Sequence, residues 1–168
     1  QGDFENLEKI VNYYIDREES NGVFTDVPKT RAKRLDYFLT KQSEIFASMS
    51  ARLEDEYIFC WLDWDGDNIL MNGGIIDYGS IRQFGLFHSD YRYDDVERYS
   101  TSILEQRNKA KYTVQTFAQL VDFLKTGERK SIRKFAKSSA VKNFDKVFVE
   151  KKLENLLFKT GFKRVDVQ

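Results

Sequence analysis

The sequence has few of the residues that define several common protein classes. A single cysteine among 168 residues excludes an internal disulfide framework and a zinc site built from several cysteines. One proline and 9 glycines exclude collagen-like and low-complexity chains, and no apolar run approaches the roughly 20 residues of a membrane-spanning helix. The first residues, Gln1-Gly2-Asp3, lack the basic and apolar segments of a signal peptide. These absences predict one globular domain over residues 1–168, cytoplasmic, or mitochondrial in a eukaryote.

Charge is balanced overall but unevenly distributed along the chain. The 27 basic and 27 acidic residues cancel, so composition predicts neither nucleic acid nor a membrane as a partner. Residues 54–98 nevertheless contain 11 acidic and 3 basic residues, whereas residues 125–164 contain 13 basic and 4 acidic residues. We interpret the basic tail either as a set of solvated helix faces or as a docking surface for an acidic partner or another domain.

Apolar residues at helical spacing predict helices at both ends of the chain. One helix carries the stripe Leu7–Ile15 and ends at Asn21-Gly22, and a second runs over residues 30–54. Helical spacing returns from Asp94 onward, and Gly161 marks the end of a last helix. The segment between the two helical regions is different, because residues 57–62 form a short, aromatic apolar run that is typical of a buried strand.

A β-hairpin is predicted around Asn72-Gly73. Asn-Gly between apolar runs favours a type I′ turn, which requires positive φ at both central residues. This turn places Asn68 directly opposite Asp77, where opposed Cβ atoms lie about 4.5–5.5 Å apart. Two oxygen donors in that position can share a hard cation such as Mg²⁺, whereas a Gly73-Gly74 turn would shift the register and separate them.

Three further acidic residues precede the predicted hairpin, in the sequence Asp63-Trp64-Asp65-Gly66-Asp67. One interpretation is a polar turn that caps the strands. Another is a calcium loop, but the sixth position of that motif is Asn68 instead of Gly and the twelfth is Gly74 instead of Glu. The third interpretation is that these carboxylates act with the predicted cation pair in a catalytic site.

The segment also resembles a known group of enzymes. Asp63, Asn68 five residues later and Asp77-Tyr78-Gly79 resemble the catalytic loop and metal-binding motif of kinase-like enzymes. The closer resemblance is to the selenoprotein O family of kinase-like protein adenylyltransferases. It spans about residues 30–124 and is specific within residues 59–90, on the matching elements Phe59-Cys60, Asp67-Asn68, Asp77-Tyr78-Gly79 and His88-Ser89-Asp90.

The resemblance implies a fold class and a function. The fold would be α+β and mainly helical, the C-terminal lobe of a kinase-like protein with a small β-hairpin that carries the metal site. The function would be metal-dependent transfer of AMP from ATP to Ser, Thr or Tyr hydroxyls of a protein substrate. Asn68 and Asp77 would hold Mg²⁺ or Mn²⁺, and Asp67 would be the catalytic base. The ordinary kinase pattern instead makes Asp63 the base of a phosphotransferase, and both choices remain open.

The sequence departs from this family in several respects, among them Asp65 in place of an Asn, the additional Asp63 and the lack of a C-terminal redox cysteine. Trp61-Leu62 stands where the family has His-Gly, and no Gly-rich loop or strand-borne lysine grips the nucleotide phosphates. We therefore expect the chain to be a catalytic lobe whose N-terminal nucleotide-gripping lobe is absent and would act as a partner. The alternative from another class is a non-catalytic, pseudokinase-like module that binds a metal and a partner protein.

Overall fold

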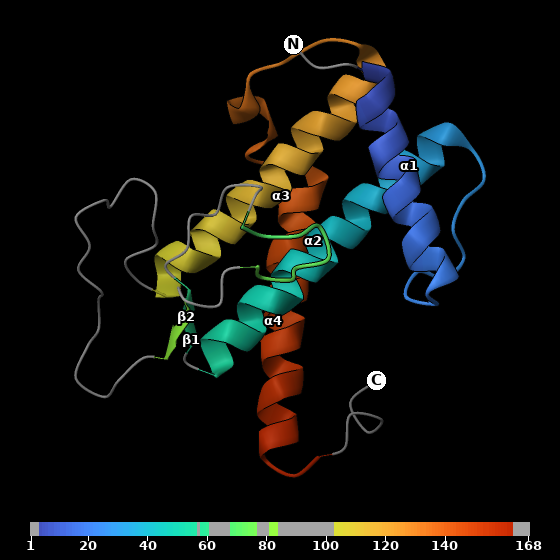
Figure 1. Ribbon diagram of the computed structural model, residues 1–168. Coiled ribbons are helices and arrows are strands. Elements are labelled where there is room, and N and C mark those ends of the chain that lie inside the picture. Colours follow the sequence, from blue (N-terminus) through green and yellow to red (C-terminus); the bar gives the residue numbers. More distant parts are fainter. Residues whose placement is uncertain (1–3, 57, 61–67, 77–80, 84–102, 163–168) are drawn as a thin grey trace.

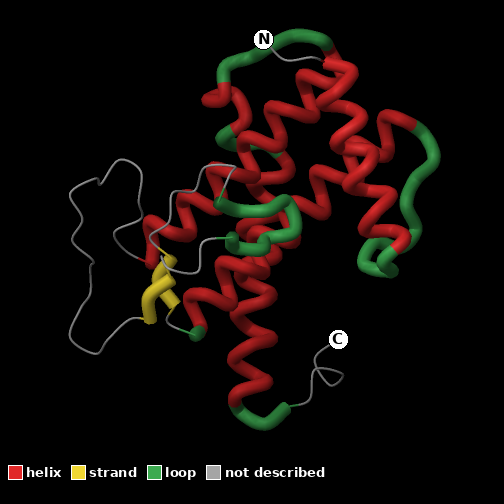
Figure 2. Tube along the Cα trace, in the orientation of Figure 1, coloured by secondary structure: helices red, strands yellow, loops and turns green. Residues whose placement is uncertain are grey.

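Four α-helices make up most of the computed structural model, which describes residues 4–56, 58–60, 68–76, 81–83 and 103–162. In chain order they are α1 (Phe4–Ser20), α2 (Arg31–Asp55), α3 (Ile103–Thr126) and α4 (Ser139–Lys159) (Figure 1). A short 3₁₀ helix, η2 (Ile132–Phe135), lies between α3 and α4. Two three-residue strands, β1 (Ile58–Cys60) and β2 (Ile81–Gln83), pair antiparallel, and Figure 2 shows how little strand accompanies the helices.

The predicted helix ends are confirmed by backbone geometry. Gly22 has φ +70, directly after the end of α1 at Ser20. Gly161 has φ +97 beyond the end of α4, and the next N–H, that of Phe162, donates to the Leu157 carbonyl at 3.1 Å. A glycine in the left-handed region lets the chain turn back and satisfy the last free carbonyls of a helix. The glycine signals in the sequence therefore located these two ends correctly.

The core is built from apolar residues that the four helices turn toward one another. Phe117 of α3 lies between two aromatic rings of α2, with ring centroids 5.6 Å from Phe38 and 5.9 Å from Phe46. Phe144 of α4 is fully buried, and full burial of such a side chain contributes roughly 1.5–3 kcal/mol. A second buried cluster joins α1 to the first half of α2 and to the last turns of α3. It consists of Val11, Tyr14, Ile15, Phe24, Leu35, Phe38, Val121 and Leu124.

Polar contacts fix the directions of the helices. Asn143 Nδ2 of α4 donates to Ser43 Oγ of α2 at 2.6 Å, and Asn155 Nδ2 donates to Asp55 Oδ2 at 2.5 Å. Residue numbers rise together along this pair, so α4 runs beside α2 in the same direction. The α3 helix runs the opposite way, since its start, at Arg107, lies 4.0 Å from Glu54.

The expected α+β fold class is wrong. The described chain is a helical protein, and it does not fit a kinase-like lobe built around a β-hairpin. The physical reason is the small size of the β element, because strands of three residues each cannot present an alternating apolar face to a core. Of residues 68–76, which were expected to form that hairpin, Ile69 is the one that is buried in the core clusters.

Candidate functional site

The chain reverses direction at residues 68–76 through a three-residue loop. Leu70 N–H donates to the Gly74 carbonyl at 2.8 Å, and Gly73 N–H donates to the Leu70 carbonyl at 2.9 Å. Gly73 has φ +79. A turn followed by a left-handed glycine is the usual form of a three-residue hairpin loop. The turn is closed by a single β-bridge between Ile69 and Ile75.

The predicted type I′ turn and its register are therefore wrong. That turn needs positive φ at both central residues, but among the described residues Asp26 is the one non-glycine with positive φ, so Asn72 does not have it. Ile69 pairs with Ile75 instead of Ile76, a shift of one residue. Asn72 Oδ1 instead accepts a hydrogen bond from Gly74 N–H at 3.0 Å. The side chain of Asn72 thus favours the three-residue loop.

The shift changes the residue opposite Asn68. The Asn68 carbonyl accepts a hydrogen bond from Ile76 N–H at 3.0 Å, so Ile76 is the neighbour of Asn68 across the turn. Of the four predicted site residues, Asn68 alone is described, while Asp63, Asp67 and Asp77 lie outside the described residues. The register argument for a directly opposed Asn68–Asp77 pair no longer holds, and their predicted roles as metal ligands stay predictions.

Two backbone pairings bracket the acidic segment. On the outer side, Cys60 at the end of β1 pairs with Ile81 at the start of β2. On the inner side, Ile69 pairs with Ile75. In the sequence, the two stretches that carry the predicted acidic residues, 61–67 and 77–80, therefore lie between described positions where the chain is paired with itself.

The turn is fixed against α2 and α1. Ile69 is 7% exposed and belongs to the core beneath the turn. A Cβ atom on Gly73 would lie 3.1 Å from Ile45 Cγ2 of α2, so the glycine allows this close approach. The Tyr14 hydroxyl of α1 donates to the Met71 carbonyl at 3.3 Å. Burial raises the pKa of Tyr14, and the nearby amide of Gln42 opposes this rise, so the hydroxyl stays a proton donor at neutral pH.

Asn68 has a side chain suited to a hard cation. Its amide oxygen is a donor of the kind that Mg²⁺ accepts, and its side chain makes no hydrogen bond to any other described residue. It is partly exposed, so a ligand from solvent can reach it. Among the described residues, no three His, Cys, Asp or Glu side chains gather closely enough to hold a metal. The predicted donor set, Asn68 together with the acidic residues beside it in the sequence, therefore stays a prediction.

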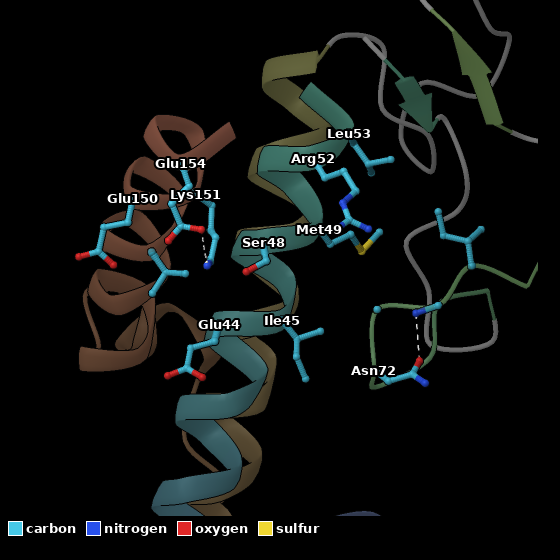
Figure 3. Close-up of a pocket in the computed structure, with 14 residues that line it drawn as sticks. Glu44, Ile45, Ser48, Met49, Arg52, Leu53, Asn72, Glu150, Lys151 and Glu154 are labelled. Atoms are coloured by element: carbon cyan, nitrogen blue, oxygen red, sulfur yellow. Dashed lines mark hydrogen bonds and ion pairs between the residues drawn. The ribbon is translucent and has the colours of Figure 1, made fainter. Parts of the chain in front are cut away.

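A groove of about 820 Å³ lies next to the turn, between α2 and α4 (Figure 3). Its apolar lining comes from Ile45, Met49, Leu53, Ile75 and Val147. Two of its carboxylates, on Glu44 and Glu154, pair with lysines at 2.9 and 2.7 Å. Sequence reasoning missed this groove, since α2, the 68–76 turn and α4, which line it, are brought together only by the tertiary fold.

Lysines of the basic tail neutralise the carboxylates at the end of α2, which begin the acidic region 54–98. Asp55 accepts hydrogen bonds from Lys152 and Asn155 of α4, and Lys159 Nζ lies 3.6 Å from Glu56. Burial acts to lower the pKa of Lys152, but the hydrogen bond to Asp55 and the charges of Glu54 and Asp55 outweigh it and raise this pKa. These residues of the tail therefore have a structural role in joining α2 to α4.

Comparisons of the chain with protein-family models, curated proteins and solved structures find no match. The resemblance to kinase-like adenylyltransferases therefore rests on residues 59–90 of the sequence alone. No described helix is long and apolar enough to cross a membrane.

Proposed function

We propose that this chain carries the divalent-metal site of an enzyme that transfers AMP from ATP to hydroxyl groups of a protein substrate. The observation that carries the proposal is the pair of backbone pairings, Cys60 with Ile81 and Ile69 with Ile75, on either side of the acidic segment. They support a compact acidic site because both of its stretches are anchored at their ends. The motif in residues 59–90 supplies the reaction type, by resemblance.

Asn68 and Asp77 would hold Mg²⁺ or Mn²⁺. When bound, such an ion neutralises negative charge on the phosphate oxygens of ATP. Asn68 is well suited to orient a ligand, since Ile76 N–H fixes its backbone carbonyl and the buried Ile69 beside it anchors the strand. Preorganised ligands of this kind lose little free energy to reorganisation when they act.

Asp67 is the proposed base, and Asp63 is the competing candidate. The carboxylate accepts the proton of the substrate hydroxyl while the hydroxyl oxygen forms a bond to the α-phosphorus of ATP. The bond between this phosphorus and the bridging oxygen breaks, and pyrophosphate leaves. If Asp63 were the base of a phosphotransferase, the attacked atom would be the γ-phosphorus and ADP would leave.

Intact-mass spectrometry tests this function. The chain, supplied with the nucleotide-gripping lobe that is expected as its partner, is incubated with ATP, Mn²⁺ and a protein rich in exposed hydroxyl groups, and we expect an added mass of one AMP on that protein. Asp77→Ala should abolish the adduct, and Asp67→Asn should reduce it more than Asp63→Asn does. Asp26→Asn is the matched control, because Asp26 is an exposed loop residue with φ 56, a conformation that asparagine also adopts readily.

Other outcomes of the same experiment contradict the proposal. A phosphoryl adduct that depends on Asp63 would identify a phosphotransferase. If neither adduct forms, and the chain binds Mn²⁺ but ATP leaves this binding unchanged, it is a non-catalytic metal-binding module.

A further inference from the structure

A segment of strongly positive charge connects α3 to α4. Residues 129–142, which we call the basic strap, contain six basic residues and no acidic residue. The strap includes η2 and the first turn of α4, and it crosses the upper part of the molecule in Figure 1. It has no part in the proposed metal site, so its charge needs a separate explanation.

The basic strap is held in place by α3. Gln119 Nε2 donates to the Lys130 carbonyl at 2.6 Å, and Gln115 Nε2 donates to the Ile132 carbonyl at 2.7 Å. Phe135 packs against the core, and the Ser138 hydroxyl caps α4 by accepting from Val141 N–H at 3.4 Å. The backbone under the charges is therefore ordered before any partner arrives, which lowers the entropic cost of binding.

Most of the charges on the strap are exposed and unpaired. Lys130 pairs with Asp122 at 2.8 Å. The other five have exposed side chains and form no ion pair with a described residue: Arg129, Arg133, Lys134, Lys137 and Lys142. Lysines elsewhere on the same helices do reach carboxylates, as Lys111 does with Asp145 at 2.6 Å.

Unpaired like charges at this spacing repel one another. Arg133 and Lys134 lie within η2, and Lys137 follows two residues after its end, so three like charges are held close together on ordered backbone, where their repulsion is unfavourable. No carboxylate of the described chain offsets this repulsion. The negative charge of an anionic partner would offset the repulsion.

We propose that the basic strap is a docking surface for an acidic segment of another protein. A short acidic peptide fits better than an extended polyanion, because the attraction extends only about 8 Å at physiological ionic strength. The chain as a whole has no net charge, so its composition gives no general attraction to a membrane or a nucleic acid. The strap also lacks the exposed aromatic side chains on which unpaired bases stack, since Phe135 packs against the core.

Fluorescence anisotropy with a short labelled polyglutamate peptide tests this proposal. We expect saturable binding that weakens as salt rises, and no binding of a polyglutamine peptide of equal length. The triple variant Arg133→Gln, Lys134→Gln, Lys137→Gln should bind about tenfold more weakly, the combined effect of three exposed ion pairs. The three replaced side chains are exposed and form no side-chain hydrogen bond or ion pair with a described residue, so the variant should fold. Circular dichroism verifies that its helices are intact.

A second triple variant is the matched control. Lys9→Gln, Lys29→Gln, Lys33→Gln removes the same charge from exposed lysines outside residues 129–142 that form no ion pair with a described residue, so it should bind the peptide like the unchanged chain. Equal loss in both triple variants would show that net charge alone attracts the peptide, and it would overturn the proposal. Tighter binding to phosphatidylserine vesicles or to single-stranded RNA than to polyglutamate would overturn the assignment to a protein partner.

Discussion

Replacing Gly73 with alanine tests whether the 68–76 turn is fixed on α2. Gly73 has φ +79, and the left-handed conformation costs an L-residue about 1–2 kcal/mol. An added Cβ would lie 3.1 Å from Ile45 Cγ2 and 3.6 Å from Met49 Sδ, so the Ile45 side chain has to move. Overpacking of this kind costs about 1 kcal/mol or more. We expect Gly73→Ala to lower the free energy of unfolding by about 2–3 kcal/mol.

Gly22→Ala separates the two contributions. Gly22 has φ +70, but a Cβ there would meet nothing within 4 Å, so this variant should lose only the backbone part, about 1 kcal/mol. Both changes in the free energy of unfolding can be measured by urea titration, with far-ultraviolet circular dichroism as the signal.

Ile45→Leu in the Gly73→Ala background removes the methyl branch that meets the new Cβ, and it should recover part of the loss. If Gly73→Ala loses no more stability than Gly22→Ala, the turn does not pack against α2 and the described geometry of the site is wrong.

Three further changes have expected outcomes. Gln42 is fully buried near Tyr14, yet neither of its amide atoms has a hydrogen bond within the described chain, so Gln42→Met should raise the free energy of unfolding by about 1 kcal/mol in urea titrations. Hydrogen bonds from Arg31 lower the pKa of Glu8 below 4.5. That stabilisation is present above pH 4.5 and is lost as pH falls through the folded-state pKa, so Glu8→Gln should show a smaller loss of stability on acidification, measured by urea unfolding at a series of pH values. Asp55→Ala leaves Lys152 and Asn155 without their main partner and should cost about 1–3 kcal/mol by the same assay, whereas Asp145→Ala, which removes an exposed ion pair with Lys111, should cost well under 1 kcal/mol.

The helices could be predicted from the sequence because their signals are local. The apolar stripe Leu7–Ile15 and the glycines at 22 and 161 each act within one or two helical turns. The directions of the helices are not local, since they depend on contacts such as that between Ser43 and Asn143, 100 residues apart. The groove between α2 and α4 was missed for the same reason.

The turn shows where local reasoning failed. The sequence Asn72-Gly73-Gly74 is compatible with several turns, and the outcome depends on whether Asn72 adopts positive φ. The Asn72 side chain bonds to Gly74 N–H, and Gly73 alone takes the left-handed conformation. When the loop is one residue longer, every residue on either side of it faces a different residue across the turn. The identity of Asn68 as a candidate ligand follows from the sequence, but its neighbour does not.

Binding of Mn²⁺, measured by electron paramagnetic resonance of the free ion during titration, tests the proposed metal site. We expect a saturable site in the unchanged chain that both Asn68→Ala and Asp77→Ala weaken strongly, while Asp26→Asn leaves it unchanged. Binding that survives both alanine substitutions, or no binding in the unchanged chain with ATP present, would contradict it.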